Sequence, residues 1–309
     1  MPELPDIVVY LEALERRVLG EKVTGVRVTS PAVVRTYDPP YDAPVGRTVV
    51  SLHRVGKRLV FGFEDGGRPT SNPPTRQGAL FLVIHLMVAG RLRWEAPGKA
   101  IPKKVGRAAL DFEHGSLILT EQGTHKRAGI WLADDWGGVT DLDRGGIEPL
   151  ETSAEEFATA LRSENLTLKR ALTDPRIFSG IGNAYSDEIL WAARLSPVKR
   201  TSQLNDDEAG RLHEAVVQSL NQWTQTLREE VGEDWPSKVT AFRDDMAVHG
   251  KFGEPCPRCG SKVQRIVYAS NETNYCATCQ TDGKLLADRS LSRLLKDDSP
   301  KTLEDLEDS

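Results

Sequence analysis

The sequence has few cysteines, no long apolar run and no repeat. Only 4 of its 309 residues are cysteine, and they all lie between positions 256 and 279, so the rest of the chain has no covalent cross-link. No apolar stretch approaches the roughly 20 residues that cross a bilayer, and the N-terminus lacks the basic and then apolar pattern of a signal peptide. An internal repeat of about 20–50 residues is also absent. We therefore expect a cytoplasmic protein with no membrane partner.

An overall excess of positive charge is also lacking. The net charge is −5, which by itself argues against a nucleic-acid-binding protein. However, residues 297–309 carry six acidic residues and one lysine, so this tail accounts for the whole net charge. Residues 236–296 hold ten Lys and Arg against six Asp and Glu, and residues 165–200 hold six against three. Such basic stretches suit phosphate contacts, although an excess of this size also fits a solvated surface.

The order of the apolar patterns predicts an α+β fold with several domains. Residues 6–19 have apolar positions at helical spacing. Seven short β-rich runs follow, which predict a β-sandwich; they cover residues 22–28, 48–55, 58–63, 79–86, 90–94, 108–112 and 116–119. After a glycine-rich break the pattern becomes helical, at residues 154–162, 168–172, 184–193 and 206–231.

These patterns set the expected domain boundaries. The domains are an N-terminal β-sandwich with its helix at 1–136, a linker at 137–150, a helical domain at 151–235, a cysteine-bearing zinc finger at 236–284, and an extra helix with an acidic tail at 285–309. Leucines at helical spacing within residues 285–296 predict that extra helix. The acidic tail is expected to be disordered.

The four cysteines predict a structural zinc site. Cys256 and Cys259 form one CxxC pair, and Cys276 and Cys279 form a second pair after sixteen intervening residues, a spacing typical of tetrahedral zinc ligands. Disulfides are the poorer explanation in a cytosolic protein of this size. Four protein ligands leave no open coordination position, so the metal holds shape and does no chemistry. The segment between the pairs reads as a β-hairpin, with residues 270–274 as its turn.

The N-terminal residues suggest a nucleophile. Initiator methionine is normally trimmed before a small second residue, which leaves Pro2 as a secondary amine beside Glu3. An α-amino group has a pKa of about 7.7–8.0, so part of it is unprotonated at neutral pH. Such an amine attacks an aldehyde-like carbon, and with proline the Schiff base is necessarily an iminium cation. The alternative is a chance start to a helix that has Pro5 in its first turn.

Glycines in the helical half suggest a phosphate-binding turn. Gly180 and Gly182 precede Asn183 at the start of an expected helix, where exposed backbone N–H groups at the positive helix end suit a DNA phosphate. The same glycines could simply close a helix-turn-helix without touching a ligand.

Five blocks of the sequence, in order, resemble those of one family. They are PELPD at 2–6, VGKRL at 55–59, IHLMVAGR at 84–91, GIGNAYSDE at 180–188, and the cysteine-bearing stretch at 248–280. Because these blocks occur together over nearly the whole chain, it is identified as a bacterial member of the formamidopyrimidine-DNA glycosylase and endonuclease VIII family. The resemblance implies a sandwich, a helix–two-turn–helix domain and a zinc-finger hairpin. It also implies a DNA-repair enzyme that removes oxidised bases and cleaves the abasic site.

The resemblance also implies roles for individual residues. Pro2 attacks C1′ of the damaged nucleotide and Glu3 moves protons. Lys57 binds a phosphate flanking the lesion, unless it is only an exposed strand lysine. Asn183 and the backbone around Gly182 hold phosphates, and Lys169 either adds a contact or is a solvated helix lysine. The base itself is everted from the duplex before it reacts.

Several positions depart from the family pattern. The hairpin arginine that the family places five residues before the third cysteine is Asn271 here, and Arg265 could replace it only if the hairpin directs it inward. The side chain that fills the gap left by the everted base is expected from Met87 or Val88. These changes put the β,δ-elimination step in question.

The arginine-phenylalanine loop of the family is replaced by residues 120–129, which keep Lys126 and Arg127 as DNA-binding cations but lose the aromatic. His125 in this loop is expected to contact phosphate or solvent rather than to catalyse. The short segment at 231–250 favours an endonuclease VIII-like or broader pocket over a dedicated oxopurine pocket.

Three functions therefore remain open. The leading one is a monomeric glycosylase and abasic-site lyase acting on damaged duplex DNA of the nucleoid. The alternatives are an abasic-site lyase with little base excision and a noncatalytic damaged-DNA-binding zinc protein.

Overall fold

The computed structural model describes residues 1–74, 78–239, 243–268, 271–286, 301–303 and 305. The chain forms two compact units. The first comprises Met1–Arg144 and Trp223–Thr240, and the second comprises Gly145–Gln222 and Ala241–Ser309. The boundary expected at residue 235 therefore falls inside the first unit, because the end of the longest helix packs with the N-terminal part of the chain.

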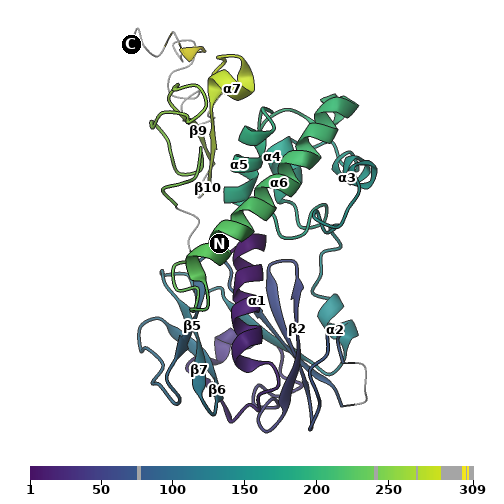
Figure 1. Cartoon of the computed structure of the whole chain (residues 1–309), viewed down its shortest axis with the longest axis vertical. Coiled ribbons are helices and arrows are strands. Elements are labelled where there is room, and N and C mark those ends of the chain that lie inside the picture. Colours follow the sequence, from purple (N-terminus) through teal and green to yellow (C-terminus); the bar gives the residue numbers. More distant parts are fainter. Residues whose placement is uncertain (75–77, 240–242, 269–270, 287–300, 304, 306–309) are drawn as a thin grey trace. The chain divides into compact units, whose positions relative to one another are not determined.

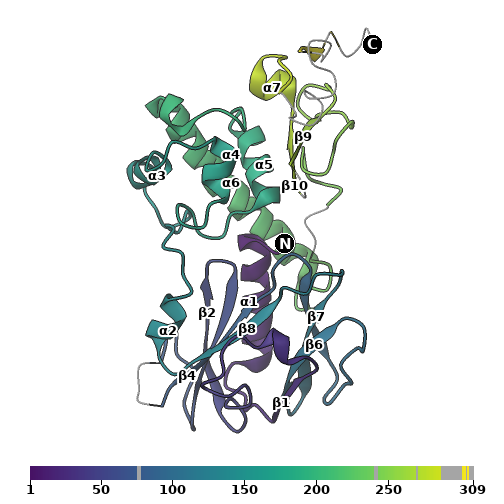
Figure 2. The ribbon, with the colours of Figure 1, turned by 180° about the vertical axis from the view of Figure 1, so that it is seen from behind.

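The first unit is built on two four-stranded antiparallel sheets (Figures 1 and 2). One sheet has the order β1-β6-β7-β5, with strands Gly25–Val28, Gly106–Phe112, Gly115–Glu121 and Gly90–Glu95. The other has the order β2-β3-β4-β8, with strands Thr48–Val55, Arg58–Glu64, Leu80–His85 and Gly129–Ala133. The seven expected strands are present, and β8 is an addition. Pairing with β4 places β8 in the sheet, and such a long-range contact leaves little trace in the local sequence.

The core of the first unit lies between the sheets and against the N-terminal helix. Helix α1 spans Leu4–Val18, and its apolar face buries Ile7, Tyr10, Leu14 and Val18 among strand residues of both sheets. Spacing of three and four residues puts these side chains on one face. The unit also contains a 3-10 turn at Pro31–Val33, the short helix α2 at Trp136–Thr140 and the end of the longest helix. Helix α2 was not expected, because a segment with two glycines has low helix propensity.

The second unit is mainly helical and ends in the hairpin. It contains α3 at Ala154–Leu161, α4 at Leu168–Thr173, α5 at Asn183–Ala192, a 3-10 turn at Thr201–Gln203, and the first part of α6, which spans Asp206–Val231. Strands β9 (Gln264–Tyr268) and β10 (Asn271–Tyr275) form the hairpin, and α7 covers Ala277–Thr281.

The hairpin corrects one expectation. Residues 271–274 are not the turn but part of β10, where Asn271 pairs with Tyr268 and Asn274 pairs with Arg265. The polar residues of this segment favour a turn by composition, but a two-stranded sheet can also carry polar side chains on an exposed face. The helix expected within 285–296 lies largely outside the described residues, as does most of the acidic tail. Among the described residues, no helix is long and apolar enough to span a membrane.

Candidate active site and nucleic-acid interface

The first residues of the chain are buried at the start of α1. Pro2 is buried, and Glu3 is only 2% exposed. The carboxylate of Asp6 accepts a hydrogen bond from the backbone N–H of Glu3 at 2.8 Å, which fixes the chain just before the helix begins. In this structure the free amine belongs to Met1, and burial lowers the pKa of this amino group below its ordinary value of 8.0. A buried amine with a lowered pKa is more often unprotonated, as nucleophilic attack requires.

Two cations and two carboxylates act on this amine. Lys57 and Arg91 lower the pKa of the N-terminal amine electrostatically, while Glu3 and Asp6 raise it. Lys57 lies in the turn between β2 and β3, not within a strand, and it is half-buried. Two sequence-predicted residues, Glu3 and Lys57, therefore lie within electrostatic range of the Met1 amine, and Pro2 directly follows Met1. Arg91 was not predicted as a site residue, although it lies in one of the matching blocks.

Asp6 is a site residue that sequence reasoning missed. Asp6 is only 5% exposed. Burial raises the pKa of its carboxyl group from 3.8 to about 7, although the hydrogen bond from the Glu3 backbone lowers this pKa. A carboxyl group with this pKa exchanges a proton near neutral pH. The sequence signal was weak, because an acidic residue in the first turn of a helix is common for capping alone.

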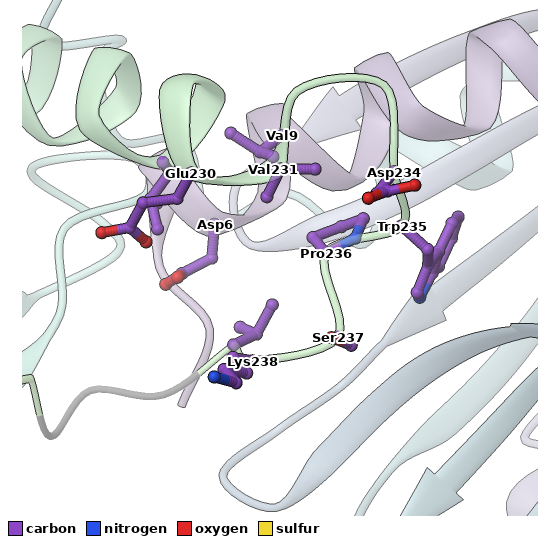
Figure 3. A pocket seen from close by; sticks show the side chains of 11 residues that line it. Asp6, Val9, Glu230, Val231, Asp234, Trp235, Pro236, Ser237 and Lys238 are labelled. Atoms are coloured by element: carbon purple, nitrogen blue, oxygen red, sulfur yellow. The ribbon is translucent and has the colours of Figure 1, made fainter.

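A pocket of about 400 Å³ adjoins Asp6. Figure 3 shows that Asp6 and Val9 come from α1, that Glu230 and Val231 come from the end of α6, and that the labelled residues from Asp234 to Lys238 come from the segment that follows α6. Hydrogen bonds from α1 and β5, and to β5, hold that segment in place. The indole N–H of Trp235 donates to the carbonyl of Leu92 at 3.0 Å, and Arg91 Nε donates to the carbonyl of Val239 at 2.6 Å.

The β4–β5 connection carries the two candidates for filling the gap in the duplex. Met87 has a positive φ of 53°, a conformation that costs a non-glycine residue roughly 1–2 kcal/mol. Val88 is 63% exposed. An exposed apolar side chain on a strained turn is the kind of feature that a protein retains for contact with a partner.

Glu121, the last residue of β7, forms hydrogen bonds that hold the loop after this strand. Its buried carboxylate accepts the backbone N–H groups of Arg127 and Ala128 at 2.6 and 2.9 Å. The ammonium of Lys126 donates to the Glu121 carbonyl, so Lys126 supports the loop. The side chains of Arg127 and His125 remain on the exposed surface.

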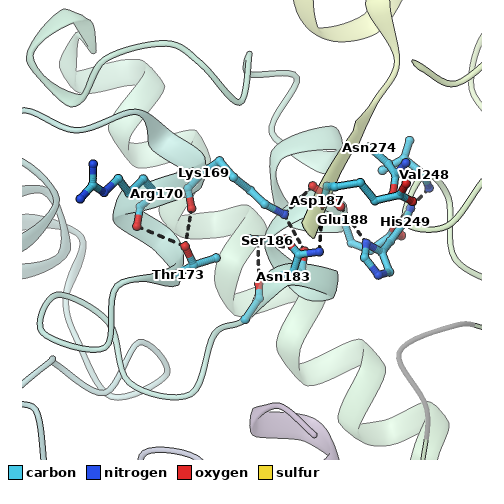
Figure 4. A network of polar contacts seen from close by, with 12 residues as sticks. Lys169, Arg170, Thr173, Asn183, Ser186, Asp187, Glu188, Val248, His249 and Asn274 are labelled. Carbon is cyan, nitrogen blue, oxygen red and sulfur yellow. Dashed lines mark hydrogen bonds and ion pairs between the residues drawn. The ribbon is translucent and has the colours of Figure 1, made fainter. Parts of the chain in front are cut away.

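In the second unit, Lys169 belongs to a buried ionic network (Figure 4). Its ammonium lies 2.5 Å from Asp187 Oδ1 and donates to the carbonyl of Asn183 at 2.6 Å. The other oxygen of Asp187 lies 2.7 Å from His249 Nδ1. Lys169 is therefore not a solvated helix lysine, because its ammonium is held by Asp187 and Asn183. It holds the first turn of α5 by the carbonyl of Asn183.

The start of α5 has the features expected of a phosphate-binding turn. Gly180 has a φ of 82°, which favours glycine, and Gly182 is the residue that caps α5. The side-chain amide of Asn183 donates to the carbonyl of Glu272 in β10 at 3.0 Å. Asn183 thus joins the helix to the zinc-finger hairpin.

The hairpin places Asn271 and Arg265 on opposite faces. Asn271 is exposed at the start of β10, and Arg265 pairs with Asn274, three residues further along that strand. Alternation along a strand directs positions an odd number apart to opposite faces. Arg265 instead lies over the ring of Phe252 at 4.3 Å and pairs with Glu272 at 3.4 Å. The structure does not offer Arg265 as a replacement for the missing arginine.

The four cysteines are arranged to hold one zinc ion. Their sulfur atoms all lie within 4.8 Å of one another, with 4.0 Å between Cys256 and Cys279 and 3.4 Å between Cys259 and Cys276. A tetrahedron with Zn–S bonds of about 2.3 Å has edges of about 3.8 Å, so the group fits. The indole N–H of Trp191 in α5 donates to Cys256 Sγ at 3.3 Å, a second contact that links α5 to the finger.

The chain matches three family models along its length. The formamidopyrimidine-DNA glycosylase N-terminal domain matches residues 1–126, the H2TH domain of the same enzyme matches residues 146–229, and the zinc finger found in FPG and IleRS matches residues 253–281. The last match supports one structural zinc ion in the cysteine site.

Curated relatives and solved structures agree with these matches. The formamidopyrimidine-DNA glycosylase of Thermus thermophilus is 32% identical over 289 residues, covering 92% of this chain and 100% of that protein. That of Exiguobacterium sibiricum is 29% identical, covering 91% and 99%. Lactococcus lactis Fpg in complex with DNA containing an abasic site has a TM-score of 0.76 at 26% identity, covering 90% of this chain and 99% of that one. The same enzyme with DNA containing N7-benzyl-Fapy-dG has a TM-score of 0.77 at 27% identity, covering 91% and 100%. The chain belongs to the formamidopyrimidine-DNA glycosylase family.

Proposed function

We propose that the protein is a DNA glycosylase for oxidised bases that also cleaves the resulting abasic site, with Pro2 as its nucleophile. The observation that carries this proposal is the burial of Pro2 and Glu3 at the start of α1, next to the Met1 amine, whose pKa is lowered chiefly by burial. Removal of Met1 transfers the free amine to the buried Pro2. The relatives and the DNA complexes of similar proteins support the same reaction class.

The reaction follows from the chemistry of a secondary amine. The lone pair of the Pro2 nitrogen forms a bond to C1′, and the bond from C1′ to the base breaks with its electron pair going to the base. The base takes up a proton and the Pro2 nitrogen loses its own, which restores the nitrogen lone pair. Glu3 then protonates O4′, which opens the sugar and leaves an iminium cation between Pro2 and C1′. The iminium draws electrons from C2′ when a proton leaves there, and the 3′ phosphate departs. Hydrolysis of the iminium releases the enzyme.

The remaining predicted residues position the nucleic acid. Lys57 binds a phosphate beside the reacting sugar, because it is a half-buried cation within electrostatic range of the amine. Asn183 and the turn at Gly182 bind phosphates through the start of α5. Met87 or Val88 enters the duplex where the base has left, and Arg127 and Asn271 contact the strand. The zinc ion, held by the four cysteines, keeps the hairpin folded and takes no part in the reaction.

The pocket beside Asp6 is the place for the everted base. It adjoins the carboxyl group that anchors Glu3, and its volume of about 400 Å³ lies within the usual range for small-molecule sites. The enzyme acts as a monomer in the cytoplasm, where the nucleoid DNA lies.

Borohydride trapping with peptide mapping tests the proposal. Reduction of the iminium on an abasic duplex fixes the DNA to the protein, and trypsin then releases the peptide of residues 2–16, since Arg16 is the first trypsin site. We expect the sugar remnant on the Pro2 nitrogen of this peptide.

Attachment to a lysine such as Lys57, or no adduct while the DNA is bound normally, contradicts the assignment. Lys57→Gln tests the proposed phosphate contact in the same assay. This variant should give less trapped product, while the sugar remnant should still be attached to the peptide of residues 2–16. A lesion panel then separates a full glycosylase from a lyase with little base excision.

A further inference from the structure

The C-terminal end of the chain returns to the zinc-finger hairpin. The finger model matches only as far as residue 281, but the chain continues, and Lys284 pairs with Thr302 in an antiparallel bridge. The backbone N–H of Leu303 donates to the carbonyl of Gly283 at 3.2 Å. These contacts hold the last part of the acidic tail, residues 297–309, against the end of the finger.

Leu303 anchors the tail by apolar packing. It packs against a cluster whose buried members are Ile266, Tyr275 and Ala277. The residues on either side of Leu303 cap the chain there. The backbone N–H of Thr302 donates to Asp305 Oδ2 at 2.8 Å, and the N–H of Asp305 donates to Thr302 Oγ1 at 3.3 Å. This reciprocal pair is a capping box, so the anchor has a defined local structure as well as a buried contact.

The apolar cluster lies on the face of the hairpin that carries Asn271. Tyr275 is four residues beyond Asn271 in β10, and Ile266 of β9 pairs with Thr273 between them. Side chains an even number of residues apart in a strand lie on the same face. Asn271 is exposed, and it is the hairpin residue that we expect to contact the DNA strand. The tail is therefore anchored on the face that meets DNA.

Opposite charges favour contact between the tail and the finger. Residues 251–284 carry five Lys and Arg against three Asp and Glu, whereas residues 297–309 carry six acidic residues and one lysine. Lys262 and Lys284 are exposed, and among the described residues neither ammonium has a hydrogen-bond or ion-pair partner. Carboxylates of the tail and phosphates of DNA attract the same cations, so they compete for the same surface.

We propose that the acidic tail is an autoinhibitory segment, which covers the DNA-contacting face of the hairpin and leaves it when DNA binds. This role rests on the proposed function, since it takes Asn271 as a DNA contact. The tail lowers the affinity for damaged and undamaged duplexes by the same factor, because either duplex has to displace it. Less of the enzyme is then held by undamaged DNA.

Neutralising the tail without touching its anchor tests the proposal. The triple variant Glu304→Gln, Glu307→Gln and Asp308→Asn keeps Leu303 and the capping pair. Dissociation constants are measured for an undamaged duplex and for a duplex with a tetrahydrofuran analogue of an abasic site, in roughly 50 mM salt. We expect the variant to bind both duplexes about fivefold more tightly than the wild type, the combined effect of three exposed charge contacts. The gain should shrink at about 200 mM salt, where such contacts are screened.

A matched triple variant controls for net charge. Glu151→Gln, Asp207→Asn and Glu214→Gln remove the same charge from exposed positions of the second unit that lie outside the finger and the tail. This variant should change either dissociation constant by less than about twofold, since isolated surface charges contribute little.

Leu303→Ala tests the anchor without changing any charge. It should also bind both duplexes more tightly than the wild type, because the tail leaves the hairpin more readily. Zinc content and circular dichroism show whether the finger stays folded in this variant. Damage to the finger weakens DNA binding, which is opposite to the expected gain.

Equal binding by the neutralised variant and the wild type overturns the proposal, and so does an equal gain in the matched control. Unchanged affinity of Leu303→Ala with a folded finger also overturns it. Borohydride trapping of the wild type on an abasic duplex reports the proposed function separately. Trapping at Pro2 without any effect of the tail refutes only the autoinhibition, whereas absence of DNA binding in every variant refutes both.

Discussion

The buried carboxyl of Asp6 leads to a quantitative prediction about stability. Its pKa is about 7 in the folded protein against an ordinary 3.8, chiefly because of burial. A carboxyl whose pKa is raised by folding binds its proton more tightly in the folded state. It therefore favours folding at low pH, and this contribution is lost as the pH rises through about 7.

The magnitude follows from proton linkage. Each pH unit between the two pKa values is worth about 1.4 kcal/mol, so from about pH 5 to about pH 8 the free energy of unfolding should fall by roughly 2.7 kcal/mol through Asp6 alone. Asp6→Asn keeps an oxygen that can accept the Glu3 N–H but cannot ionise. The wild-type profile should therefore fall relative to that of Asp6→Asn by this amount.

Urea unfolding at several pH values measures the difference. Tryptophan fluorescence is the suitable signal, because five of the six tryptophans lie in the first unit. Asp135→Asn is the control, since Asp135 also accepts a backbone N–H at a helix start but is exposed. Its profile should run parallel to that of the wild type. Profiles of Asp6→Asn and wild type that stay parallel within about 0.5 kcal/mol would refute the reasoning.

Three further predictions concern the zinc site, the buried network and the strained turn. Removal of zinc with a chelator, or Cys276→Ser, should unfold the hairpin and abolish DNA binding, as measured by metal content, circular dichroism and gel shift; a folded, DNA-binding apoprotein would contradict a structural role. Lys169→Met should lower the free energy of unfolding in urea by about 3–5 kcal/mol, because it removes the ammonium beside the buried carboxylate of Asp187. A decrease of less than about 1 kcal/mol would show that the pair contributes little to stability. Met87→Gly should raise the free energy of unfolding by roughly 1 kcal/mol, since glycine adopts a φ of 53° without strain; a loss of stability would mean that Met87 packing outweighs the strain.

Local patterns predicted most of the elements. Strand β2 and helix α6 have the bounds expected from the sequence, Thr48–Val55 and Asp206–Val231. The reason is that apolar side chains recur every two residues in a strand and every 3.6 residues in a helix, a spacing that the local sequence shows directly. Helices α2 and α7 and strand β8 are not predicted from the sequence, and part of β10 is predicted as a turn. Strand β8 is defined by its pairing with β4, a contact between segments far apart in the chain.

Some features of the candidate site are likewise set by the local sequence, and others depend on the tertiary structure. The sequence by itself determined the zinc ligands and the candidate nucleophile, because two CxxC pairs and an N-terminal proline carry their chemistry in residue type and spacing. Only the tertiary structure decided that Asp6 is buried, that Lys169 pairs with Asp187, and that an acidic pocket lies beside the N-terminus. Burial and ion pairing depend on which distant segments pack together, so the pKa of a side chain and the charge of a pocket are properties of the fold.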